Sequence, residues 1–237
     1  PYTSVADWNW LTAFDWQKPR HRLKIAYEFV GEDYASIGNP RTYQDYKGLT
    51  AFGSYRLTDR WSVSSSLLRY RNNLNDDPND TTNQNQALSF STSFQPWRDQ
   101  SLSLRSSHLT SNPEGGPSPG SSSHSRSYGI DYSLPFLMKT RALASYDYFR
   151  TEEPAGSDSE SHAAGTTLFK SFGRGSSWSV SERLRKEFRE LEEDTVNLDT
   201  SLNLNLQLSP ALASYANGSY VRNLTDGSEN SDTLGTA

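Results

Sequence analysis

Hydrophobic and polar residues alternate with a period of two along most of this chain. The clearest run is residues 196–208, where Val196 and a series of leucines occupy one set of alternate positions and mostly Asn, Asp, Ser and Gln occupy the other. Successive side chains of a strand point to opposite faces, so this run predicts a β-strand with one apolar and one polar face. A tilted strand crosses a bilayer with about 9–11 residues, and a run of this length suits such a crossing.

The same alternation recurs in about twelve segments. They are residues 7–16, 22–31, 47–57, 61–71, 86–95, 100–110, 126–135, 140–150, 162–172, 177–188, 195–208 and 211–223. The links between them are alternately short and long. The short links are 17–21, 58–60, 96–99, 136–139, 173–176 and 209–210, and the long links are 32–46, 72–85, 111–125, 151–161 and 190–194. This predicts an up-and-down meander with short turns at one end and polar loops at the other.

We therefore predict an all-β fold, a transmembrane up-and-down antiparallel β-barrel of the bacterial outer membrane. Aromatic residues flank both kinds of link, as expected for rings at the two membrane interfaces. Those near the short turns are Trp61, Phe94, Trp97, Phe136, Phe172 and Trp178, and those nearer the long links are Tyr70, Tyr128, Tyr148 and Tyr220. A soluble β-sandwich or β-propeller also alternates, but its polar face tends to carry many Lys and Glu, whereas Ser, Asn, Gly and Thr dominate here.

Composition narrows the classes of function. The 237 residues are 33% hydrophobic but 12% aromatic, which argues against a disordered chain. The net charge of −5 gives no reason to expect nucleic acid. The chain has no cysteine, which excludes a disulfide framework, a thiolate metal site and covalent c-type haem attachment. We therefore expect no cofactor and no resident metal.

The order of the links predicts where the first and last segments point. Short turns are periplasmic and long loops extracellular in such barrels, so the first segment begins and the last one ends outside the cell. A complete bacterial barrel has both termini in the periplasm, so we expect at least one strand before residue 7 and one after residue 223. Residues 1–237 are then an excerpt of one barrel domain with at least about fourteen strands, lacking its N- and C-terminal strands.

Residues that carry catalysis or bind metals are sparse. Ser107-His108-Leu-Thr-Ser111-Asn112 faintly resembles the His/Ser/Asn arrangement of outer-membrane phospholipases. His108 and Ser111 are three positions apart, however, and fall on opposite faces of a strand, so we expect no enzyme. Asp76-Asp77-Pro-Asn-Asp80 offers carboxylates to Ca²⁺ but lacks the Glu that ends a calcium loop, which favours a solvated loop.

Residues 181–194 are compatible with two structures. Positions 184, 188 and 191 are apolar with the i, i+4, i+7 spacing of a helix. As a strand, the segment places Glu182 and Lys186 on the lipid side and Arg183, Arg185 and Arg189 on the other side. We favour a strand that leaves the membrane near residue 182 and extends above it, with its basic side lining the mouth. A short helix is the alternative.

The hairpin at residues 48–71 resembles hairpins of outer-membrane porins. In those families a strand ends in a Leu-Thr-Asp-Arg turn, present here at residues 57–60, and continues into alternating Ser and apolar residues, present here as Trp-Ser-Val-Ser-Ser-Ser-Leu-Leu. The resemblance covers nearly the whole chain as a pattern. Similar hairpins occur in exopolysaccharide exporters, in sheaths of multihaem electron conduits and in TonB-dependent transporters.

These patterns predict an outer-membrane pore that passes polar solutes or a polymer. The alternatives are a sheath around a partner protein or a TonB-dependent transporter barrel. The expected partners are outer-membrane lipid and, for the sheath, a protein in or below the barrel. The residues predicted to line the lumen are Ser89, Ser91, Ser93, Arg105, Asp131, Arg183, Arg185, Asn197, Asn203 and Asn205.

Overall fold

The computed structural model describes residues 9–31, 45–74, 76–115, 121–136, 140–153, 158–172, 175–190, 194–209, 212–225 and 233–236. These ranges contain thirteen β-strands. The strands are β1 (Asn9–Lys18), β2 (His21–Val30), β3 (Tyr46–Thr58), β4 (Trp61–Asn72), β5 (Thr82–Phe94), β6 (Ser101–Glu114), β7 (Ser123–Pro135), β8 (Arg141–Glu152), β9 (Ser159–Phe172), β10 (Ser176–Arg189), β11 (Thr195–Ser209), β12 (Leu212–Asn223) and β13 (Thr233–Thr236). None of the described residues belongs to a helix long and apolar enough to cross a membrane.

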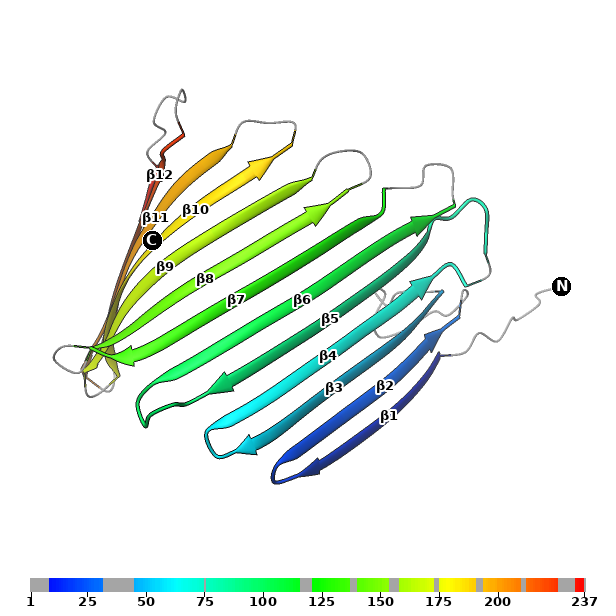
Figure 1. Cartoon of the computed structure of the whole chain (residues 1–237), viewed down its shortest axis with the longest axis horizontal. Helices are drawn as coiled ribbons and strands as arrows, with labels where there is room; N and C mark the ends of the chain where they lie inside the picture. The colour runs from blue at the N-terminus through cyan, green and yellow to red at the C-terminus, as the bar shows by residue number, and fades with distance from the viewer. Residues whose placement is uncertain are drawn as a thin grey trace. The chain divides into compact units, whose positions relative to one another are not determined.

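Each strand pairs with its neighbours in the sequence, from β1 through to β13 (Figure 1). The pairings are antiparallel wherever the register is defined, as in β1 and β2, where Trp10 lies opposite Phe29 and Trp16 opposite Leu23. The predicted all-β, up-and-down antiparallel fold is therefore confirmed. Closure into a barrel stays a prediction.

All twelve segments predicted from the alternation are strands, but several strands extend further toward the long links. β5 begins at Thr82 rather than at residue 86, and β6 continues to Glu114 rather than to residue 110. β10 remains a strand as far as Arg189, so the helical alternative is wrong for the described part of residues 181–194. The centres of most long links, such as residues 32–44, lie outside the described residues. A short strand, β13, follows residue 223 and pairs with β12. The absence of terminal strands from residues 1–237 stays a prediction.

The contacts divide the chain into two compact units. Unit 1 comprises residues 1–92, 106–126 and 151–156, and unit 2 comprises residues 93–105, 127–150 and 157–237. In unit 1, Ala51 lies opposite both Ile25 and Leu67, whereas Ser54 lies opposite both Arg22 and Ser64. The pairing therefore gives this unit one apolar face and one polar face.

Unit 2 repeats this arrangement. Val180 lies opposite Leu168 on one side and Leu202 on the other, while Ser181, the next residue, lies opposite Thr167 and Ser201. Hydrophobic side chains thus line up across β9, β10 and β11 on an apolar face, and small polar side chains line up on a polar face.

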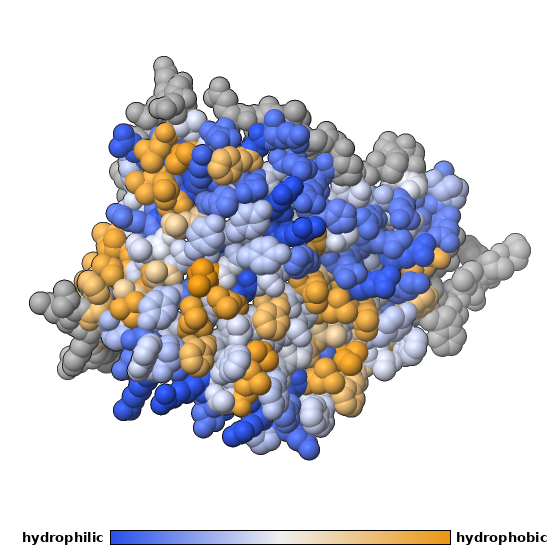
Figure 2. Space-filling model, viewed as in Figure 1, coloured by the Kyte–Doolittle hydropathy of each residue, from blue (hydrophilic) through white to orange (hydrophobic). Residues whose placement is uncertain are grey.

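The apolar faces are not packed into a core. The buried hydrophobic residues of the described chain are Val30 and Ala163, while Phe14, Phe90 and Leu202 keep 55%, 47% and 53% of their surface exposed. Figure 2 shows hydrophobic side chains open on the surface in patches across the strands. Since burial of apolar surface drives folding in water, these side chains need another apolar environment.

Candidate functional site

The polar face of unit 2 carries a row of paired charges that begins at Asp147 in the middle of β8. One carboxylate oxygen of Asp147 accepts a hydrogen bond from Arg105 Nη2 of β6 at 2.9 Å, and the other accepts one from Arg183 Nη2 of β10 at 3.0 Å. Arg105 Nη2 also lies 3.3 Å from Asp131 Oδ2 of β7. We call Arg105, Asp131, Asp147 and Arg183 the charged row.

Two glycines make room for these contacts. A Cβ at Gly129 of β7 would lie 2.7 Å from Asp147 Oδ1 and 2.8 Å from Arg105 Nη2. Gly165 of β9 lies opposite Arg183, and a Cβ there would lie 3.1 Å from the Glu182 carbonyl oxygen. The strands between the charged residues therefore carry no side chain at these points, and the charges of β6, β8 and β10 can meet.

The charged row is open to solvent and balanced in charge. The side chains of Arg105 and Arg183 are each 51% exposed, and that of Asp147 is 35% exposed. Ion pairs this exposed contribute about 0–1 kcal/mol to stability. Two arginines and two aspartates leave no net charge, while the guanidinium groups keep further N–H donors for a polar ligand. The row therefore contributes little to the stability of the fold and leaves polar groups exposed on this face.

The charged row unites three of the predicted lumen residues, Arg105, Asp131 and Arg183, and the remaining residues predicted in unit 2 lie on the same polar face. Arg183 lies opposite Asp199, and the next predicted arginine, Arg185, lies opposite Asn197. Asn203 Nδ2 donates to Ser179 Oγ at 3.5 Å, and Asn205 Nδ2 donates to the Gly175 carbonyl oxygen at 3.4 Å. Ser93, near the end of β5, is two positions from Ser91 and so projects to the same side of that strand.

Ser89 and Ser91 lie in unit 1 and form a serine ladder with β4. The hydroxyl groups of Ser66 and Ser89 are 2.6 Å apart, and those of Ser64 and Ser91 are 2.7 Å apart. A similar pair in unit 2 joins Ser181 to Ser201 at 2.6 Å. These hydroxyl pairs make the polar faces neutral and rich in both donors and acceptors.

Sequence reasoning missed the residue at the centre of the charged row, Asp147, and both glycines. Asp147 stands between Tyr146 and Tyr148, and this local alternation already places it on the polar face. Its two arginine partners are 42 and 36 positions away, and no local pattern indicates them.

The weaker candidates from the sequence gain no support as reactive sites. His108 and Ser111 are separated by an odd number of positions in β6, so they project to opposite faces, as predicted. In the link after β4, Asp76 forms an ion pair with Arg71, and the Asp77 carboxylate accepts bonds from the backbone and side chain of Asn79. Among the described residues, no group of His, Asp and Glu is arranged to hold a metal ion.

That link is instead organised around the buried side chain of Asn73. Its Nδ2 donates to the carbonyl oxygens of Asp77 and Asp80 at 3.0 Å each, and its Oδ1 accepts from the Asp77 N–H at 2.8 Å. Asn73 has a φ of 51°, a left-handed conformation that Asn tolerates. The acidic residues here therefore take part in a compact turn.

Comparisons with known proteins yield a structural likeness. No protein-family model and no curated protein matches the sequence. Among solved structures, the chain is similar to the alcaligin outer membrane receptor FauA from Bordetella pertussis, with 15% sequence identity and a TM-score of 0.46. The similarity covers 90% of this chain and 46% of that chain, so this chain spans less than half of the receptor's length.

Proposed function

We propose that this chain forms part of the wall of an outer-membrane β-barrel that passes polar solutes or a polymer. The observation that carries this proposal is the exposure of the apolar faces: Phe14, Phe90 and Leu202 are about half exposed, and the described residues have almost no hydrophobic core. Soluble monomers rarely expose large contiguous apolar patches. The core of a bilayer has no water to form hydrogen bonds with backbone groups. A sheet can cross it when its backbone groups pair with neighbouring strands and its apolar face contacts lipid.

The polar faces support passage of solutes. The serine ladder of unit 1 and the Ser181–Ser201 pair of unit 2 offer neutral hydroxyl groups. The charged row adds guanidinium and carboxylate groups in equal number. A lining of this kind exchanges hydrogen bonds with sugar-like or zwitterionic solutes without strong preference for one sign of charge.

Ion selectivity in planar lipid bilayers tests this proposal. Arg105→Gln together with Arg183→Gln removes two positive charges and leaves Asp131 and Asp147 without their arginine partners. We expect the reversal potential in a salt gradient to shift toward cation selectivity, because the remaining carboxylates attract cations.

The matched control is Lys170→Gln together with Lys186→Gln. These lysines lie on the apolar face of β9 and β10, opposite Trp178 and His162. The control removes the same charge from the lipid side and is expected to leave the selectivity unchanged. A protein that inserts but conducts no ions would contradict an open pore and favour a sheath or a plugged transporter barrel. Equal shifts in both double variants would contradict the assignment of the faces.

A further inference from the structure

The apolar face of unit 1 changes character as its strands approach the long links. Ile25, Ala51 and Leu67 form one row across β2, β3 and β4. The next row toward the long links includes Leu49 opposite Arg69, and the row after that includes Lys47 opposite Arg71. Neighbouring rows on one face are two residues apart, or about 7 Å along the strand. Positive charge therefore begins one row beyond the last fully apolar row.

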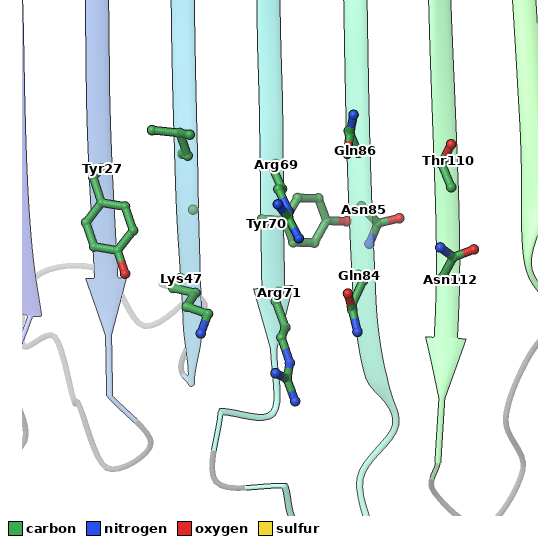
Figure 3. A pocket seen from close by; sticks show the side chains of 12 residues that line it. Tyr27, Lys47, Arg69, Tyr70, Arg71, Gln84, Asn85, Gln86, Thr110 and Asn112 are labelled. Atoms are coloured by element: carbon green, nitrogen blue, oxygen red, sulfur yellow. The ribbon is translucent and has the colours of Figure 1, made fainter.

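Lys47, Arg69 and Arg71 form what we call the basic rim cluster. All three line one groove of about 560 Å³ on the surface of the sheet, together with Gln84, Gln86 and other neutral polar residues. Figure 3 shows the three cations on the adjacent strands β3 and β4, close to the ends that lead into the links.

The charges of this cluster are only partly neutralised by the protein. Arg71 forms an ion pair with Asp76, while its Nε is buried without a hydrogen-bond acceptor. The side chains of Lys47 and Arg69 have no ion-pair or hydrogen-bond partner among the described residues. Lys47 lies directly opposite Arg71, and like charges at opposed positions destabilise an antiparallel sheet. An anion placed between them would relieve this repulsion.

We infer that the basic rim cluster binds the phosphate groups of a lipid headgroup in the outer leaflet. The inference rests on the proposed function, which turns this face toward lipid and the long links toward the cell exterior. Arginine and lysine are the usual phosphate-binding side chains, and basic residues at a membrane surface attract anionic lipids. The rings of Tyr27 and Phe29, opposite Leu49 and Lys47, lie at the same level, as aromatic residues do at membrane interfaces. The neutral amides of Gln84 and Gln86 supply further donors to a sugar phosphate.

Native mass spectrometry of the detergent-solubilised protein tests this inference. The probes are diphosphorylated lipid A, the same lipid without its phosphates, and inorganic phosphate. We expect the protein to retain the diphosphorylated lipid. Retention should fall at least about tenfold in Lys47→Gln/Arg69→Gln, because this variant removes two charge-assisted contacts. The charge-preserving variant Lys47→Arg/Arg69→Lys should retain the lipid.

The matched control is Lys24→Gln/Arg56→Gln, which removes two cations from β2 and β3 on the polar face, where they lie opposite Phe52 and Ser62. It should retain the lipid as the unmodified protein does. The inference would be overturned if the control variant lost the lipid equally, or if the lipid without phosphates were retained equally. It would also be overturned if inorganic phosphate saturated the site with no preference for the lipid. If the protein conducts no ions, but Lys47→Gln/Arg69→Gln loses the lipid and the control variant retains it, the pore is refuted and the lipid site remains supported.

Discussion

Gly129 is the position at which one added carbon would disturb the charged row most directly. Its Cβ would meet the ends of two flexible side chains, Arg105 and Asp147, rather than backbone. Gly129→Ala should therefore leave the sheet intact while separating this ion pair, and free energies of unfolding should change by less than about 1 kcal/mol. Once displaced, Arg105 becomes available to solutes, and we expect the reversal potential to shift toward anion selectivity.

Gly48→Ala provides the comparison for this single-residue test. Gly48 also lies on the polar face, but its Cβ would be 3.6 Å from the nearest atom, an ordinary contact. It should change neither stability nor selectivity. If the two alanine variants have the same effect on the reversal potential, Gly129 does not act by making room for Arg105.

At the scale of the strands, the sequence predicts the elements well but makes several of them too short at the long links. Residues 82–86, Thr-Asn-Gln-Asn-Gln, are polar at every position, and so no hydrophobic alternation marks them as a strand. They nevertheless continue β5, because the backbone hydrogen bonds that join neighbouring strands do not depend on side-chain polarity. The alternation therefore predicts only the part of a strand that has an apolar face. It does not predict a fully polar extension of that strand.

Adjacent residues of β11 provide a test of the two faces. Leu204 lies between Trp178 and Ala216 on the apolar face, and Asn203 lies between Ser179 and Asn217 on the polar face. Leu204→Arg should cost about 2–4 kcal/mol, because it places a charge in lipid near the middle of the strand. Asn203→Arg should be tolerated. Heat-modifiability on gels measures the assembled fraction, and equal behaviour of the two variants would contradict the division into faces.

At the scale of the whole molecule, the polar face is predictable from the sequence but the meeting of its charges is not. Parity within a strand is enough to assign Arg105, Asp131 and Arg183 to one face. The meeting of Arg105 and Arg183 at Asp147 depends on the stagger of five neighbouring strands, which accumulates over several hairpins and turns. The basic rim cluster also depends on strand register. Lys47 and Arg71 lie at the two ends of the β3–β4 hairpin, and the register of this hairpin places them opposite each other.

The lipid site in the outer leaflet requires the long links of the barrel to face the cell exterior. Two single-cysteine variants test this orientation. Asp59, in the turn between β3 and β4, and Asp80, in the link between β4 and β5, are both exposed and lie at opposite ends of β4. The chain has no native cysteine, so Asp59→Cys and Asp80→Cys are each labelled without background. With the longer links outside the cell, an impermeant maleimide should label Asp80→Cys on intact cells and Asp59→Cys only after the outer membrane is opened. The reverse result would place Lys47, Arg69 and Arg71 at the periplasmic leaflet. It would refute an outer-leaflet phosphate as their ligand, even if the conductance experiments had established an open pore.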